Sequence, residues 1–211
     1  MKLQLQDTWW ELLPEKAMYR RDTETLILAD LHLGKATHFR KSGIAIPAGS
    51  ANHDYKVLYD LIEYKEPRNV YLLGDLFHST HNSEWQQFDA LTGCFPQVCF
   101  TLIMGNHDIL KRHHYEAANL RIIDDHLTED GWIYSHKPLE NVPAEYINIA
   151  GHIHPGCRIE GIARQSISLP CFYFSPPLLL LPAFGHLTGL KILSTTDAEV
   201  FAVTGDSVVR V

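Results

Sequence analysis

The chain has 211 residues and a formal net charge of −7 at pH 7, a size that suits one domain. This charge argues against a protein coated with basic residues for binding nucleic acid, but it leaves room for a local basic strip. Hydrophobic residues make up 45% of the chain, which is normal for a globular protein and excludes global disorder.

Nothing in the sequence predicts export or membrane insertion. Residues 1–21 contain no apolar run of the length that a secretory signal needs. The most apolar stretch, residues 169–184, is interrupted by four prolines, which a membrane-spanning helix does not tolerate. The four cysteines are irregularly spaced and form no C-x-x-C pair, as is usual for reduced thiols. We therefore expect a cytoplasmic protein without membrane contact, and the sequence leaves its oligomeric state open.

Strand and helix patterns alternate over the first two thirds of the chain. Short runs rich in β-branched and aromatic residues predict strands at Thr25–Ala29, Asn69–Leu73, Val98–Met104, Trp132–Tyr134 and Tyr146–Ala150. Apolar residues at helical spacing predict helices over Ser50–Lys65, which stops before Pro67, and over Ser83–Phe95. This alternation is typical of an α/β fold.

The C-terminal part of the chain has a different character, because it predicts strands only. These strands are Cys171–Ser175, Leu178–Leu181, Val200–Val203 and Ser207–Val211, with turns at Pro176-Pro177 and Gly205-Asp206. We therefore expect a single α/β (α+β) domain over residues 1–211, in which a pair of mixed sheets carries flanking helices.

Polar residues that suit a site lie just past the ends of the predicted strands. The five strands lead, in order, into Asp30-Leu31-His32, Gly74-Asp75, Gly105-Asn106-His107-Asp108, His136 and Gly151-His152-Ile153-His154. Rigid strands fix the geometry there, while the loops carry the chemistry. Side chains two residues apart in an extended segment share a face, so D-x-H and H-x-H can each reach one centre or two adjacent centres.

The donors in this set predict a metal centre, and four of them come from the 13 histidines of the chain. They comprise two carboxylates, one amide and four imidazoles: Asp30, Asp75, Asn106, His32, His136, His152 and His154. Seven mixed donors exceed what one tetrahedral zinc ion needs, and no thiolate is among them. A carboxylate can bridge, so the set fits two metal ions that share one oxygen ligand. Oxygen mixed with imidazole suits Mn²⁺, Fe or Zn²⁺ more than Mg²⁺ or Cu.

Each block alone is weak, since D-x-H occurs by chance and G-D is an ordinary turn signal. The complete ordered series from Asp30 to His154 resembles the calcineurin-like metallophosphoesterase superfamily. The resemblance implies a four-layer α-β-β-α sandwich and a pair of metal ions. It also implies that Asp30, His32, Asp75 and His154 hold one metal ion, and that Asp75, Asn106, His136 and His152 hold the other, with Asp75 bridging.

A narrower likeness is to the bacterial ligase-associated DNA damage response endonuclease family. It rests on Leu31–Lys35, on the Phe39-Arg40…Gly43…Pro47 stretch, on Gly74–Ser79 and on the tail Leu181–Gly185. It implies an Mn²⁺-preferring phosphodiesterase that acts on DNA and is encoded beside a DNA ligase, an exonuclease and a helicase. The tail is the more specific signal, because nothing in metal chemistry requires it.

The expected reaction is attack on a phosphodiester by a hydroxide that bridges the two metal ions. His107 is the candidate proton donor to the leaving oxygen, because it lies between Asn106 and Asp108 and no metal-binding role is left for it. Asp108 is expected to orient the imidazole of His107.

Basic residues near the site are the candidates for contact with a phosphate backbone. Lys35 and Arg40 follow the D-x-H loop, and His78 follows Asp75 by three positions. A solvated surface face is the alternative interpretation for the two cations, and an ordinary loop position is the alternative for His78.

Three functions follow from these patterns. The first is a metal-dependent phosphodiesterase acting on DNA, as an endonuclease in DNA repair. The second is a phosphoesterase for nucleotides or other small esters, which the acidic net charge favours because duplex binding relies on many basic contacts. The third is a non-catalytic scaffold on the same fold, against which the complete ligand set and His107 argue.

Overall fold

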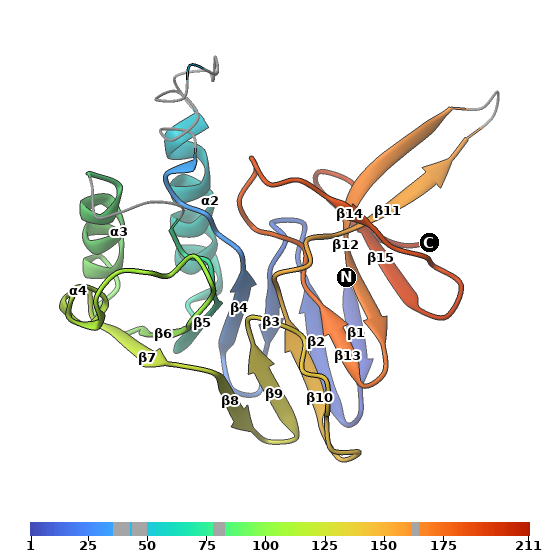
Figure 1. Cartoon of the computed structure of the whole chain (residues 1–211), viewed down its shortest axis with the longest axis horizontal. Helices are drawn as coiled ribbons and strands as arrows, with labels where there is room; N and C mark the ends of the chain where they lie inside the picture. Colours follow the sequence, from blue (N-terminus) through green and yellow to red (C-terminus); the bar gives the residue numbers. More distant parts are fainter. Residues whose placement is uncertain (36–42, 44–49, 78–82, 162–164) are drawn as a thin grey trace.

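The computed structural model describes residues 1–35, 43, 50–77, 83–161 and 165–211. Two β-sheets pack face to face, and helices lie on one side of the pair (Figure 1). The first sheet has the strand order β1-β2-β3-β4-β5-β6-β7 in the described residues. Its strands are β1 (Lys2–Leu5), β2 (Thr8–Leu12), β3 (Met18–Arg20), β4 (Thr25–Ala29), β5 (Asn69–Leu73), β6 (Cys99–Ile103) and β7 (Leu120–Ile123).

The second sheet has the order β14-β11-β12-β13-β10-β9-β8, with β15 paired to β12 and β16 paired to β15. Its strands are β8 (His126–Glu129), β9 (Trp132–Ser135), β10 (Ile147–Ala150), β11 (Pro155–Glu160), β12 (Ser166–Ser175), β13 (Leu178–Leu180), β14 (Lys191–Ile192), β15 (Glu199–Val203) and β16 (Val208–Arg210). The described helices are α2 (Ser50–Lys65), α3 (Ser83–Gly93) and α4 (Arg112–Ala117).

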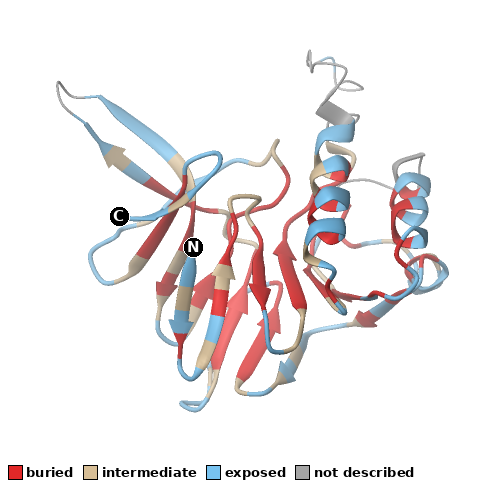
Figure 2. Ribbon diagram, turned by 180° about the vertical axis from the view of Figure 1, so that it is seen from behind, coloured by how far each residue is buried: buried red, intermediate tan, exposed pale blue. Residues whose placement is uncertain are grey.

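Parallel pairing brings the carboxyl ends of several strands to the same level. In the first sheet, β4, β5 and β6 are parallel, and their last residues Ala29, Leu73 and Ile103 stand side by side in the register. In the second sheet, β9 and β10 are parallel, and Ser135 pairs with Ala150. Strands of this kind are buried on both faces, which explains their nearly continuous apolar sequences (Figure 2).

Two hydrophobic clusters hold the layers together. Between the sheets, Trp10 of β2 packs edge-on against Trp132 of β9 with ring centroids 4.8 Å apart, among residues of both inner faces. On the outer face of the first sheet, Leu58 and Ile62 of α2 and Phe88 of α3 pack in a second cluster, and all three are nearly inaccessible to solvent. The apolar sides of α2 and α3 therefore cover the outer face of the first sheet.

The prediction of two mixed sheets with flanking helices is confirmed. The expected strands Thr25–Ala29 and Asn69–Leu73 and the helix Ser50–Lys65 match the structure residue for residue, and the tail consists of strands as expected. Cys157 and Cys171 are buried and all four cysteines are free. None of the helices in the described residues is long and apolar enough to cross a membrane.

The described helices all lie beside the first sheet, and none of them covers the outer face of the second sheet (Figure 1). At β10, Ile147 and Ile149 point into the core, so Asn148 points outward. There, the amide N–H of Leu139 in the connection 136–146 donates to Asn148 Oδ1 across 2.9 Å. An irregular crossover thus covers this part of the second sheet.

Candidate metal centre

The seven predicted metal ligands come together where the carboxyl ends of the parallel strands of both sheets meet. Asp30, Asp75 and Asn106 follow β4, β5 and β6, while His136, His152 and His154 follow β9 and β10, and His32 lies two residues past Asp30. Because β4 to β6 are in register, their polar successors are held at one level. The site is therefore built from residues distant in sequence on two rigid sheets.

The ligands form two groups that match the two metal sites implied by the sequence. Ligand atoms of Asp30, His32 and His154 lie within 4.8 Å of one another, and so do those of Asp75, His136 and His152. In the first group, His154 Nε2 is 3.5 Å from Asp30 Oδ1. In the second group, His136 Nε2 is 3.1 Å from His152 Nδ1.

Asp75 lies between the two groups. Its Oδ2 is 3.8 Å from His32 Nε2, and its Oδ1 is 3.5 Å from His136 Nε2. One carboxylate therefore presents an oxygen to each group, as a bridging ligand must. Asn106 joins the second group, because its Oδ1 is 3.0 Å from His136 Nε2.

Buried polar atoms at the site fit a bound cation. Asp30 is completely buried, and its Oδ1 has no hydrogen-bond partner; neither has His154 Nε2, which is 3.5 Å away. Burying such atoms unpaired is costly, and a cation held by both of them removes that cost. Carboxylate and imidazole donors suit Mn²⁺, Fe or Zn²⁺. The residues present therefore fit a pair of divalent metal ions.

The backbone of the ligand loops is strained. Positive φ angles, which side chains other than glycine rarely adopt, occur at Asp30 (53°), His32 (46°), Asp75 (50°), His152 (67°) and His154 (52°). Each such residue costs about 1–3 kcal/mol, and strain of this kind gathers at functional sites. These five backbone conformations therefore lower the stability of the fold, and they direct the five side chains toward the metal centre.

Close packing at Gly151 connects the two sheets behind the site. The next residue, His152, donates its backbone N–H to Asp30 Oδ2 across 2.7 Å. A Cβ atom at Gly151 would lie 2.6 Å from the same Oδ2, which is too close for any real side chain. Glycine is therefore required before His152 so that Asp30 can approach the backbone of β10.

The structure gives a physical explanation for the tail segment Leu181–Gly185, which the sequence alone did not supply. It leaves the second sheet, where Leu181 N–H donates to Ala150 O, and reaches the first sheet, where Phe184 N–H donates to Ala29 O across 2.8 Å. Gly185 N–H then donates to Asp30 O. The tail therefore fastens the strand ends that carry ligands on both sheets.

Asp108 is bound to the backbone of two loops at the metal centre. Its carboxylate accepts hydrogen bonds from the backbone N–H groups of Asp75 and Gly105, each at 2.8 Å, and of Leu76 at 2.9 Å. Burial raises the pKa of Asp108 to about 6, against the opposing effect of these hydrogen bonds. The structure thus makes Asp108 a brace between the loops after β5 and β6, and its orientation of the imidazole of His107 stays a prediction.

His107 lies at the rim of the centre. Its backbone N–H donates to Asp75 Oδ1 across 2.9 Å, and its ring centroid is 5.6 Å from that of His32. The residue is exposed, so its side chain is accessible to a substrate at the metal ligands. The catalytic role of His107 stays a prediction.

The predicted substrate contacts are described only in part. Lys35 lies beside the centre: burial lowers its pKa, and the charges of Asp75 and Asp30 act in the opposite direction. Arg40 and His78 lie outside the described residues. Sequence reasoning passed over Lys137, although its position directly after the ligand His136 is a signal that it lies near the centre.

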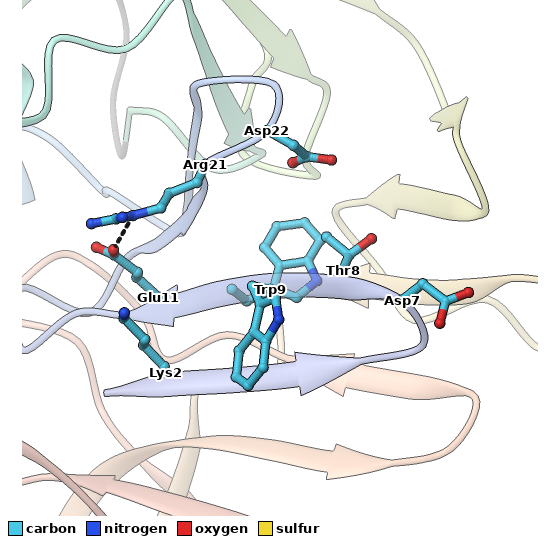
Figure 3. A pocket seen from close by; sticks show the side chains of 8 residues that line it. Lys2, Asp7, Thr8, Trp9, Glu11, Arg21 and Asp22 are labelled. Atoms are coloured by element: carbon cyan, nitrogen blue, oxygen red, sulfur yellow. Dashed lines mark hydrogen bonds and ion pairs between the residues drawn. The ribbon is translucent and has the colours of Figure 1, made fainter.

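Another part of the molecule has a cavity that lies away from the metal centre. It has a volume of about 540 Å³ and is lined by Lys2, Asp7, Thr8, Trp9, Trp10, Glu11, Arg21 and Asp22 (Figure 3). Trp10 pairs with Arg20, and Arg20 pairs with Thr25 at the start of β4, whereas Asp30 follows its end. The cavity is therefore at the opposite end of the sheet, and none of the predicted site residues lines it.

Comparison with known proteins agrees with this site. The family profile described as "Calcineurin-like phosphoesterase" matches residues 24–170, a range that contains all seven ligands. No curated protein matches the chain significantly. Among solved structures, the chain is similar to the nuclease MPE of Pseudomonas putida, with a TM-score of 0.84 and 22% identity over 100% of this chain and 99% of that chain. This likeness shows a common fold.

The family profile covers well over half of the chain, and both ligand groups lie within the matched residues. The superfamily resemblance noted in the sequence is thereby confirmed. The chain belongs to the calcineurin-like phosphoesterase family and is a metal-dependent phosphoesterase.

Proposed function

We propose that the protein is a phosphodiesterase that cleaves DNA internally, uses two divalent cations with Mn²⁺ as the native metal, and acts in DNA repair. The observation that carries the proposal is the complete, two-group ligand set beside the exposed His107. The likeness to a nuclease over the whole chain supports it. By resemblance, its functional partners are a DNA ligase, an exonuclease and a helicase, and it acts as a single cytoplasmic domain.

In the proposed mechanism, one set of residues binds the metal ions and a different residue donates the proton. When bound, the two cations neutralise charge on the phosphoryl oxygens and activate water. Asp30, His32, Asp75 and His154 would hold one cation, and Asp75, Asn106, His136 and His152 would hold the other. Asp30 and Asp75, both buried, supply the negative charge that retains cations at the meeting edge of the sheets.

His107 supplies the proton that the leaving oxygen needs. It is fixed through its backbone to the bridging carboxylate of Asp75, which ties the position of its imidazole to the position of the metal ligands. Its exposure allows it to reach a substrate atom, and an imidazole can donate and accept a proton. General acid catalysis of this kind typically contributes about 10²–10⁴-fold.

A phosphoesterase for nucleotides or other small esters is the second candidate, favoured by the net charge of −7. Bound dications change the local balance, because they add positive charge at the place where phosphate binds. Steep loss of activity between low and moderate salt favours the DNA substrate, since each phosphate contact adds to the salt dependence.

The test compares four substrates with the metal-stripped protein after addition of Mn²⁺, Zn²⁺ or Mg²⁺. We expect Mn²⁺ to restore cleavage of bis-p-nitrophenyl phosphate and of closed circular plasmid, which has no ends and so reports internal cleavage. Linear DNA and p-nitrophenyl phosphate complete the set, and Asp75→Asn is the inactive control. A preference for the monoester p-nitrophenyl phosphate would overturn the assignment as a phosphodiesterase. Hydrolysis of bis-p-nitrophenyl phosphate without any DNA cleavage would overturn the assignment as an endonuclease.

A further inference from the structure

A cavity of about 260 Å³ opens beside the second ligand group. Its lining residues are Met104, Gly105, Asn106, Asp124, Asp125, Ser135, His136, Lys137 and Leu139. Asn106 and His136 are metal ligands, so the cavity begins at the metal centre itself. Its volume is just below the range of about 300–1,000 Å³ that is typical of pockets for drug-sized ligands, which suits a single nucleotide.

Lys137 is the lysine of this cavity. The two carboxylates of the lining contact other side chains: Asp124 lies 3.1 Å from Arg112, and Asp125 lies 2.7 Å from His126. Lys137 is exposed and takes part in no ion pair among the described residues.

The loop that carries Lys137 is fixed by a buried side chain. Asn148 is inaccessible to solvent, and its Nδ2 donates to Ser135 Oγ across 2.8 Å, while its Oδ1 accepts from Leu139 N–H across 2.9 Å. Ser135 Oγ in turn donates to Lys137 O across 2.7 Å. Such support positions a binding residue in advance, so that little freedom is lost when a ligand arrives.

Cationic residues therefore lie beside ligands from both sheets. Lys35 lies three residues past the ligand His32 on the side of the first sheet, and Lys137 directly follows the ligand His136 on the side of the second. A small ester is held by the metal ions alone, whereas a DNA strand continues past them and meets a further phosphate. We propose that the cavity is a subsite for one nucleotide beside the scissile phosphate, with Lys137 bound to the phosphate of that nucleotide and the cavity holding its sugar and base.

This subsite rests on the proposed function, and Lys137→Gln tests it against Lys56→Gln, a matched change at an exposed lysine of α2. Binding of a single-stranded oligonucleotide is measured by fluorescence anisotropy from low to moderate salt, and hydrolysis of bis-p-nitrophenyl phosphate is measured with Mn²⁺. We expect Lys137→Gln to weaken oligonucleotide binding about fivefold, the upper range for one exposed ion pair. The slope of log K against log salt should fall by about 0.7. Hydrolysis of the small diester, which has no flanking phosphate, should be unchanged.

A second variant, Leu139→Trp, fills the cavity while leaving Lys137 in place. It should weaken oligonucleotide binding and spare the small diester, with thermal unfolding as the control for a folded chain. If both variants bind the oligonucleotide like Lys56→Gln while the unmodified protein cleaves DNA, the subsite is wrong and the proposed function stands. If the unmodified protein hydrolyses the small diester but neither binds nor cleaves the oligonucleotide, both proposals are overturned.

Discussion

The backbone N–H of Gly185 donates a hydrogen bond to the carbonyl oxygen of Asp30 across 3.2 Å. Gly185 ends the tail that also bonds to Ala150 and Ala29, so a segment late in the chain holds the first metal ligand in place. A Cβ atom at Gly185 would lie 2.4 Å from the carbonyl oxygen of Leu31, between the ligands Asp30 and His32. The tail is thus part of the support of the metal centre.

We predict that Gly185→Ala weakens metal binding, because the added methyl group must displace the Asp30–His32 loop. Loss of such support typically costs about 10- to 100-fold in metal affinity. Competition with a metal-binding dye measures this directly. Gly189→Ala is the matched control, because nothing lies within 4 Å of a Cβ atom there. Equal affinities of the two variants would show that the tail does not support the site.

The bracing role of Asp108 predicts a loss of stability in Asp108→Asn. An amide accepts through one oxygen only, so at least one of the three backbone N–H groups loses its charged partner inside the protein. The expected loss is about 1.5–3 kcal/mol in the free energy of unfolding, measured by urea denaturation. A variant as stable as the unmodified protein but defective in catalysis would instead support the role inferred from the sequence, orientation of His107.

For His107→Ala we expect the metal ions to stay and turnover to fall. The loss should be about 10²–10⁴-fold on DNA, whose alkoxide leaving group needs a proton, and small on bis-p-nitrophenyl phosphate, whose leaving group does not. His113→Ala, at an exposed histidine of α4, is the matched control. Undiminished turnover on DNA would remove His107 from the mechanism.

Asp22 lies far from the metal centre, and we expect it to make the stability of the folded protein depend on pH. Its carboxylate accepts two hydrogen bonds of 2.8 Å from the buried Arg20, and they lower the pKa of Asp22 below its value of about 3.9 in an unfolded chain. The contribution to stability is therefore complete above pH 4 and is lost as pH falls through the folded-state pKa.

Asp22→Asn should be less stable than the unmodified protein at pH 7, by at most about 1 kcal/mol because the pair reaches solvent. The difference should shrink below about pH 4. Urea denaturation at several pH values measures it, with Asp7→Asn at an exposed carboxylate as the control. A difference that stays constant down to pH 3 would show that the pKa of Asp22 is not lowered.

The sequence predicted the parts of the fold whose burial is uniform. Strands β4 and β5 are buried on both faces, so their apolar runs mark them unambiguously. Strand β1, with the sequence KLQL, lies at the edge of its sheet and buries only Leu5, so its pattern was too weak to predict a strand. The seven ligands were predictable because each lies within four residues of the end of a predicted strand.

The supports of the site were not predictable, because they depend on contacts between distant segments. Asp108 binds the backbone of two loops, and Asn148 binds the loop that carries Lys137; neither pairing leaves a local pattern in the sequence. The irregular crossover 136–146, which contacts β10 through Leu139 and Asn148, was not predicted either.

The metal content of the Mn²⁺-reconstituted protein, measured by inductively coupled plasma mass spectrometry, tests the central claim most directly. We predict two Mn²⁺ ions per chain, because the two ligand groups share Asp75 and each is complete. His154→Ala and His152→Ala should each lower this content, whereas His126→Ala, at an exposed histidine that is not a predicted ligand, should leave it unchanged. A protein that binds no transition metal, or the same amount in all three variants, would contradict the metal centre described above.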